Sequence, residues 1–260
     1  MPADDSHFPV DNGGDGSTLE VALFATCVAN AARPQAARAA LKLLRAAGCR
    51  VAVPEQGCCG QPAFNAGYEQ EARRMAEALL AALKHFNAIV APSASCAGML
   101  RHHYPELFRG DTDEARAREL AGRVFELTEF LVRVLRIRLR DLGPPLRVAL
   151  HTSCSAHREM GVAGDHLALL GQLDNVELVE PERKEECCGF GGTFAVKHPE
   201  ISAVMVHDKA EALAATGATR MVTGDCGCLM NIDGHLRFQG TDLPAQHIAS
   251  FVWERTRGTD

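Results

Sequence analysis

The chain has 260 residues, of which 47% are hydrophobic, enough for one large domain or for two of about 120 residues each. A net charge of −6 and few aromatic residues, with one Trp and two Tyr, provide neither a basic surface nor stacking platforms for nucleic acid, so no nucleic-acid partner is expected. No apolar run reaches the roughly 18 residues that cross a bilayer, so no transmembrane segment is expected.

The ten cysteines would suit a secreted domain held together by disulfides, but this chain is far larger than such domains usually are. Residues 1–18 are rich in Asp, Gly, Ser and Pro, and we expect them to be a disordered leader. They also lack the apolar segment of a signal peptide. A reducing cytoplasm is therefore the expected location, where thiols stay free to bind metals.

From residue 20 onward, short continuous apolar runs alternate with helical patterns, which is typical of parallel strands covered on both faces. In the first half, strands are predicted over 21–26, 50–54 and 88–91, with helices over 35–47 and 68–86. In the second half, strands are predicted over 146–152, 176–179 and 221–223, with helices over 155–173 and 199–216. The predicted fold class is α/β, with two tandem Rossmann-like lobes that have mainly parallel sheets.

Residues 112–142 are predicted to be a largely helical connector between the lobes, because apolar residues recur there at helical spacing. These residues are Leu120, Val124, Leu127, Leu131 and Val134. A final helix over 244–256 is predicted to cap the second lobe. The predicted domains are the leader 1–18, a first lobe 19–143 that includes the connector helix, and a second lobe 144–260.

One cysteine pattern occurs twice, with matching residues 127, 129, 129 and 132 positions apart. Each copy has one cysteine, an adjacent pair followed by glycine, and one more cysteine: Cys27, Cys58, Cys59 and Cys96, then Cys154, Cys187, Cys188 and Cys228. In both copies, each single cysteine and each adjacent pair follows the carboxyl end of a predicted strand, where open parallel sheets form binding crevices. We expect the eight sulfurs to converge, four per lobe, in two pockets. Four thiolates suit a [4Fe–4S] cluster or a tetrahedral zinc site, so all eight are candidate cofactor-binding and metal-binding residues.

The adjacent cysteines cannot easily form a disulfide with each other, but they can present two sulfurs from one tight loop. We expect Gly60 and Gly189, which follow the pairs, to leave room where the backbone passes close to an inorganic core. A thiol redox enzyme that uses the pair as a transient disulfide remains a further interpretation.

Three other residues are possible metal ligands. Cys226 is either a fifth ligand of the second site or an exposed thiol, and the exposed thiol is favoured. His151 and His157 lie on either side of Cys154, and each could bind a metal, donate a hydrogen bond to a cluster sulfur, or fill an ordinary structural position. Cys49 is predicted to be structural.

These motifs resemble the cysteine-rich CCG domain, in which a cysteine, a Cys-Cys-Gly string and a Cys-x-x-Cys string follow one another. The likeness extends from about residue 20 to 255 and is carried by CCGQPAFN at 58–65, PSASC at 92–96, ECCGFGGTF at 186–194 and GCLMN at 227–231. The domain occurs in glycolate oxidase iron–sulfur subunits, in heterodisulfide reductases and in lactate utilisation proteins, and the strings look most like the last of these.

The resemblance implies an iron–sulfur electron-transfer subunit, and so an oxidoreductase component, of a complex that oxidises L-lactate or a related 2-hydroxy acid such as glycolate. It implies two partners, a ferredoxin-type iron–sulfur subunit and a third small subunit. The implied cofactors are iron–sulfur clusters of the [4Fe–4S] type, with zinc possible in one lobe. A zinc-stabilised scaffold and a thiol–disulfide redox protein are the alternatives.

The sequence departs from the CCG pattern in one respect. The final Cys-x-x-Cys is incomplete in both halves, because Met99 and Asn231 stand where its second cysteine belongs. Both residues are predicted to pack or to form hydrogen bonds. Each site therefore offers four cysteines in place of five.

Overall fold

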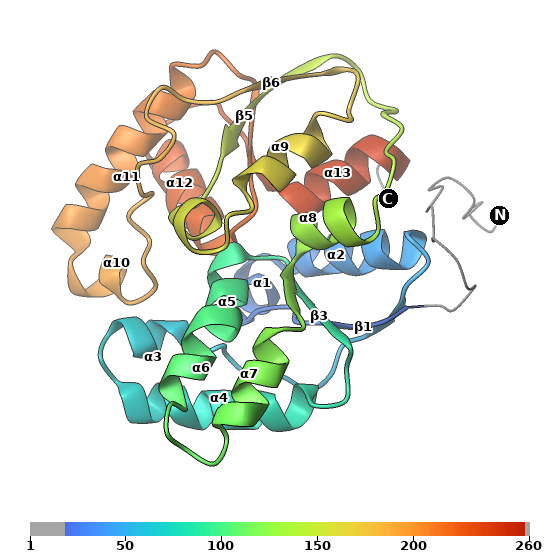
Figure 1. Cartoon of the computed structure of the whole chain (residues 1–260). Coiled ribbons are helices and arrows are strands. Elements are labelled where there is room, and N and C mark those ends of the chain that lie inside the picture. Colours follow the sequence, from blue (N-terminus) through green and yellow to red (C-terminus); the bar gives the residue numbers. More distant parts are fainter. Residues whose placement is uncertain (1–18, 258–260) are drawn as a thin grey trace.

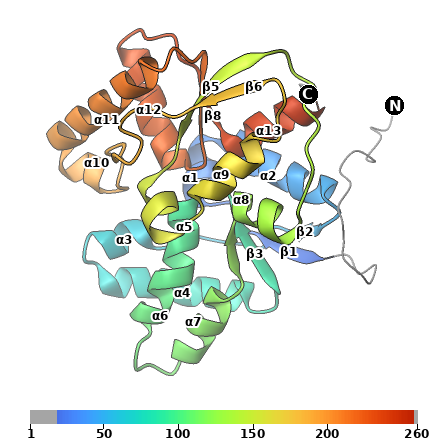
Figure 2. The ribbon, with the colours of Figure 1, turned by 45° about the horizontal axis from the view of Figure 1, so that its top comes forward.

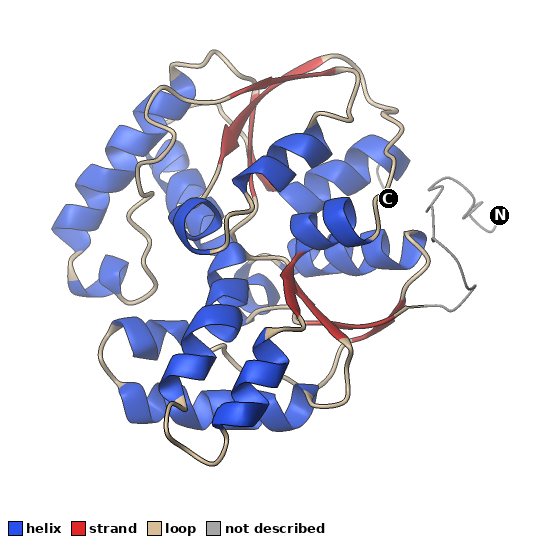
Figure 3. Ribbon diagram, viewed as in Figure 1, coloured by secondary structure: helices blue, strands red, loops and turns tan. Residues whose placement is uncertain are grey.

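The computed structural model describes residues 19–257, and the predicted leader, 1–18, lies outside them. Two four-stranded parallel sheets form two lobes (Figure 1). The strand order is β2-β1-β3-β4 in one sheet and β6-β5-β7-β8 in the other, so the lobes repeat one topology. Helices cover both faces of each sheet (Figure 3). The predicted α/β fold with two tandem lobes is confirmed.

The first lobe begins with an alternation of strands and helices that follows the predicted order up to β3. Its elements are β1 (Glu20–Leu23), α1 (Cys27–Ala32), α2 (Pro34–Ala46), β2 (Arg50–Ala52), α3 (Gln61–Asn65), α4 (Glu69–Leu83), β3 (Ala88–Ala91), α5 (Ala94–Gly98), the π-helical turn η1 (Met99–His103), α6 (Tyr104–Leu107), α7 (Glu114–Ala121), β4 (Val124–Glu126), α8 (Leu127–Glu129) and the π-helical turn η2 (Phe130–Val134). Every residue of β3 is buried, as its continuous apolar run predicts for an inner strand of a parallel sheet.

The second lobe repeats this alternation. Its elements are β5 (Leu146–His151), the π-helical turn η3 (Ser155–Glu159), α9 (Ala163–Leu170), β6 (Val176–Val179), α10 (Phe194–Lys197), α11 (Pro199–Ala214), β7 (Arg220–Thr223), α12 (Cys226–Phe238), β8 (Ala245–His247) and α13 (Ile248–Arg257). Among residues 19–257, no helix combines the length and the apolar composition that crossing a bilayer requires.

The fourth strand of each sheet was not predicted. The expected connector helix over 112–142 is wrong, because Val124–Glu126 forms β4, which pairs with β3, and residues 136–145 have no regular structure. Similarly, the expected helix over 244–256 begins with strand β8, which pairs with β7. Each of these strands has three residues and continues directly into a helix. A segment that short cannot establish a strand period, so the helical spacing of the following residues dominated the pattern.

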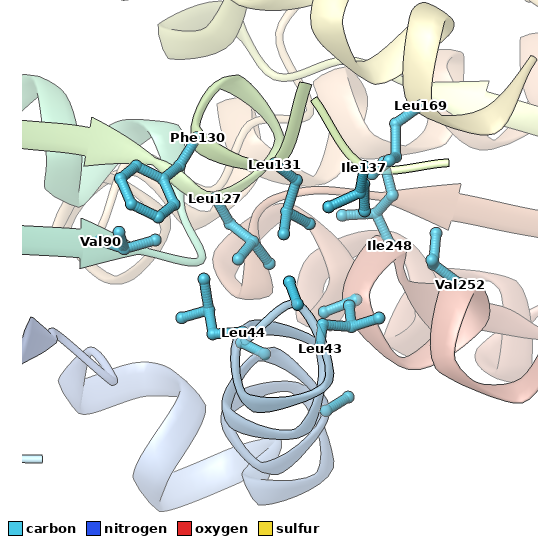
Figure 4. Close-up of a cluster of buried hydrophobic side chains, with 14 of the residues drawn as sticks. Leu43, Leu44, Val90, Leu127, Phe130, Leu131, Ile137, Leu169, Ile248 and Val252 are labelled. Atoms are coloured by element: carbon cyan, nitrogen blue, oxygen red, sulfur yellow. The ribbon is translucent and has the colours of Figure 1, made fainter. Parts of the chain in front are cut away.

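One hydrophobic core extends through both lobes (Figure 4). It joins Leu43 of α2 and Leu131 of η2 in the first lobe to Leu169 of α9 and Val252 of α13 in the second. Helix α13 packs on β7 and β8 of its own lobe and also on α2, while α9 packs on α8 and η2. The turned view places these helices side by side between the two sheets (Figure 2). The last helix therefore packs on both lobes, whereas the sequence predicted only that it would cap the second lobe.

Candidate metal centre

The loops that follow the strands of both sheets meet at one cavity of about 150 Å³ between the lobes. All eight predicted cysteines line it: Cys27, Cys58, Cys59 and Cys96 from the first lobe, and Cys154, Cys187, Cys188 and Cys228 from the second. In each lobe the cysteines follow the first three strands along the chain. The sequence predicted two pockets, whereas the structure brings both groups of sulfurs to a single cavity.

Within the first lobe the four thiols are neighbours in a chain. The side chains of Cys27 and Cys58 are hydrogen-bonded, and so are those of Cys58 and Cys59. The Cys59 thiol donates to Cys96 Sγ at 3.5 Å. The described residues contain free cysteines and no disulfide among these four. The sulfurs are therefore close enough to bind one metal centre together.

The second lobe has the same chain of thiols. Cys154 is hydrogen-bonded to Cys187, and Cys187 to Cys188. The Cys188 thiol donates to Cys228 Sγ at 3.1 Å. The internal repeat of the sequence is thus also a repeat of the site.

The first cysteine of each adjacent pair is the one that favours the thiolate. Hydrogen bonds from the side chains of Cys27 and Cys59 lower the pKa of Cys58, and the Gly60 N–H supports the charge at 3.5 Å from its Sγ. Cys187 has the same surroundings: its thiol neighbours lower its pKa, and the following peptide N–H lies 3.3 Å from its Sγ. Because thiolates are the form that binds metals, each lobe has one sulfur already disposed to do so.

The backbone requires the glycine that follows each pair. Gly60 and Gly189 have φ angles of +87° and +79°, which residues with a side chain rarely adopt. A Cβ at Gly189 would lie 2.8 Å from the Ser202 carbonyl oxygen of α11, and one at Gly60 would lie 3.2 Å from the Ala72 carbonyl oxygen of α4. The glycines therefore let the cysteine loops pack against helices, while the close approach to an inorganic core that the sequence led us to expect stays a prediction.

Side chains anchor the backbone of both pairs. The Tyr104 hydroxyl of α6 donates to the Cys59 carbonyl at 3.0 Å, and Asn231 Nδ2 of α12 donates to the Cys188 carbonyl at 2.7 Å. Met99, at the position that matches Asn231, is fully buried. The predicted packing and hydrogen-bonding roles of Met99 and Asn231 are confirmed.

Asp225 is a residue of the site that the sequence analysis missed. Its buried carboxylate lines the cavity and accepts hydrogen bonds from the hydroxyls of Ser93 at 2.5 Å, Ser95 at 2.8 Å and Ser153 at 2.5 Å. It therefore joins the loop after β7 to the loops after β3 and β5. The repeat contained a signal, because Asp225 and Ser93 each lie three residues before the last cysteine of their copy.

Cys226 and Cys49 are buried thiols with different positions. Cys226 also lines the cavity, and it packs against Ala29 and Ala36 of the first lobe, so the prediction of an exposed thiol is wrong. Burial raises the pKa of Cys226 to about 12. Cys49 lies in the core that joins the lobes, as its predicted structural role requires, and burial raises its pKa to about 11.

The two candidate histidines differ in their positions. His151, at the end of β5, is buried, and one of its ring nitrogens lies within 4.8 Å of the Sγ atoms of Cys188 and Cys228. Burial lowers the pKa of His151 to about 3, so the ring is neutral. Neither histidine is among the residues that line the cavity, and His157 does not belong to the group of neighbouring ligand atoms that contains His151.

The donor set fits a soft metal or an iron–sulfur cluster. Thiolate sulfur and imidazole nitrogen suit zinc, copper and iron–sulfur clusters, whereas magnesium and calcium require oxygen ligands. Apolar groups such as Val28 and Phe190 and polar groups such as Gln61 and Asn65 complete the lining. The residues present are therefore suited to binding a metal or an iron–sulfur cluster, as the sequence led us to expect.

The cysteine-rich domain model CCG matches residues 21–101 and 148–233. The chain belongs to the family of cysteine-rich CCG-domain proteins. Among its relatives, lactate utilization protein A of Oceanobacillus iheyensis is 42% identical over 238 residues, which cover 90% of this chain and 96% of that protein. Lactate utilization protein A of Shouchella clausii is 43% identical over 238 residues, which cover 90% of this chain and 98% of that protein.

A solved structure supports the fold. The crystal structure of a hypothetical protein from Helicobacter pylori superposes with a TM-score of 0.66 at 10% sequence identity. The match covers 93% of this chain and 49% of that one, so the present chain spans about half the length of its solved neighbour. At this identity the likeness concerns the fold alone.

Proposed function

We propose that the chain is an iron–sulfur electron-transfer subunit, acting in the cytoplasm, of a complex that oxidises L-lactate. The observation that carries the proposal is the convergence of eight cysteines, four neighbouring thiols from each lobe, on one cavity. The names of relatives that align over nearly their whole length support lactate. Glycolate is the alternative 2-hydroxy acid.

In this proposal the four cysteines of each lobe hold one centre of the [4Fe–4S] type. A bound iron–sulfur cluster supplies one-electron transfer at a potential set by its ligands, hydrogen bonds and burial. The chain contributes the N–H group of Gly60, which donates to Cys58, and the equivalent N–H group in the second lobe. It also shields part of each sulfur set from water, because Cys59 and Cys188 are almost completely buried, whereas Cys27, Cys58, Cys154 and Cys187 are partly exposed.

The second lobe offers a route from the site to the protein surface. Cys187 also lines a neighbouring pocket of about 530 Å³, which includes the exposed Lys197 and His198. This pocket is where we expect a partner to exchange electrons with the chain. The proposed partners are a ferredoxin-type iron–sulfur subunit and a third small subunit.

The test is reduction by substrate. The protein is prepared anaerobically with iron and sulfide, combined with the two partner subunits, and mixed with L-lactate or glycolate while the iron–sulfur absorbance is followed. The proposal predicts bleaching with L-lactate, and faster bleaching with L-lactate than with glycolate. If dithionite bleaches the protein but neither acid does, the assignment to a 2-hydroxy-acid complex is wrong.

Metal content distinguishes the alternatives. Zinc in both lobes with no iron would support the zinc-stabilised scaffold. Redox activity that survives complete removal of metal would support a thiol–disulfide protein. Zinc in one lobe and iron in the other would retain electron transfer but reduce the chain to a single redox centre.

A further inference from the structure

The two lobes repeat their cysteines but differ beside them. Three residues before the first cysteine of each copy stands Phe24 in the first lobe and His151 in the second. Phe24 is fully buried in the same apolar cluster as Cys59 and Cys96. A ring without polar atoms is therefore enough to fill this buried position of the fold.

His151 occupies the equivalent position with polar atoms that have no partner. It is 1% exposed, and both of its ring nitrogens lack a hydrogen-bond partner among the described residues. Burying unpaired polar atoms costs free energy, which phenylalanine at the matching position avoids. Because one ring nitrogen lies within 4.8 Å of the Sγ atoms of both Cys188 and Cys228, a metal held by these sulfurs would supply the missing partner.

We propose that His151 binds the metal of the second-lobe centre through a ring nitrogen in place of one of the four cysteines of that lobe, so that the two lobes hold chemically different centres. The inference rests on the metal-binding function proposed above. The first lobe then provides sulfur ligands alone, whereas the second provides sulfur and nitrogen. Histidine ligation raises the reduction potential of an iron–sulfur centre relative to all-cysteine ligation. Electrons that enter the first lobe would therefore move to the second, whose Cys187 also lines the pocket that reaches the surface.

The test is pulsed EPR of the reduced, anaerobically reconstituted protein, which detects nitrogen nuclei bound to the metal. A Cys59→Ser background removes the first-lobe signal. We expect a strong nitrogen coupling that changes when the protein is made with ¹⁵N-histidine and disappears in His151→Phe. The variant copies the first lobe, and His157→Phe is the matched control because, among the described residues, His157 does not belong to the group of ligand atoms that lie within 4.8 Å of one another around Cys188 and Cys228. If the second lobe holds zinc, substitution by Co²⁺ gives the same readout.

Two results would overturn the proposal, and they differ from each other. A loaded second lobe with no strong histidine coupling, or with a coupling that persists in His151→Phe, would show that His151 is not a ligand and would leave the proposed function intact. A protein that binds neither iron nor zinc would remove the proposed function and this assignment together. The ¹⁵N comparison leaves position 151 unchanged and shows whether any histidine is bound. If the His151→Phe variant fails to fold, a coupling that persists in His157→Phe excludes the neighbouring histidine, and the absence of any histidine coupling still overturns the proposal.

Discussion

Replacement of Asp225 with alanine tests whether one buried carboxylate aligns the two lobes around the cavity. Three serine hydroxyls donate to this carboxylate at 2.5–2.8 Å, two from the first lobe and one from the second. A hydrogen bond to a charged group contributes about 1.5–3 kcal/mol, so three would contribute about 4.5–9 kcal/mol in total. Burial of the charge costs several kcal/mol, which leaves a net loss of about 2–4 kcal/mol for Asp225→Ala.

Urea unfolding of the metal-free protein measures this loss. The matched control is Asp208→Ala, because the Asp208 side chain is 44% exposed, and this variant should stay within about 0.5 kcal/mol of the wild type. The segments that Asp225 joins lead into Cys96, Cys154 and Cys228, so Asp225→Ala should also weaken metal binding by about 10-fold or more in both lobes. An Asp225→Ala protein as stable as the control, with full metal content, would refute the reasoning.

The remaining predictions concern stability, and urea unfolding checks each of them. Gly189→Ala should lower the free energy of unfolding by about 2–4 kcal/mol, because a positive φ costs about 1–2 kcal/mol and the new Cβ also meets a helix carbonyl. Gly48 has a positive φ but open space around the new Cβ, so Gly48→Ala should cost only about 1–2 kcal/mol from the positive φ. Asp141→Asn should cost about 3–5 kcal/mol, because it breaks the buried ion pair with Arg255, whose atoms lie 2.6 Å apart. Burial alone would raise the pKa of Asp141, but hydrogen bonds from Arg255 and two backbone N–H groups hold it below its ordinary value. The stabilisation from the Asp141 carboxylate is therefore complete above its unfolded pKa of about 3.9 and is lost as the pH falls through its lower folded pKa. Because asparagine does not titrate, Asp141→Asn should lose less stability than the wild type over this range of falling pH. Leu43→Ala, in the shared core, should cost about 2–5 kcal/mol and lower the stability of both lobes in one transition; two separate transitions would contradict a common core.

Local patterns were enough to predict the inner part of each lobe. Continuous apolar runs predicted the first three strands of both sheets, and β3 and β6 agree with their predicted ranges residue for residue. The repeated cysteine spacing predicted which side chains would gather at the strand ends. Both signals lie within short stretches of chain, so a single sequence contains them.

The missed features depend on contacts between distant residues. The single cavity results from how the lobes pack through α2, α13, α8 and α9, and no local pattern encodes that packing. The role of Asp225 depends on Ser93, which is 132 residues away and in the other lobe. The burial of Cys226 similarly depends on Ala29 and Ala36 of the first lobe.

Iron and acid-labile sulfide analysis, lobe by lobe, tests the central claim most directly. We predict iron and sulfide in equal amounts in the wild type, loss of about half of both in Cys59→Ser and in Cys188→Ser, and full retention in Cys49→Ser, whose thiol lies in the core. Equal losses in all three variants, or a wild-type protein that takes up no iron under anaerobic conditions, would contradict the account.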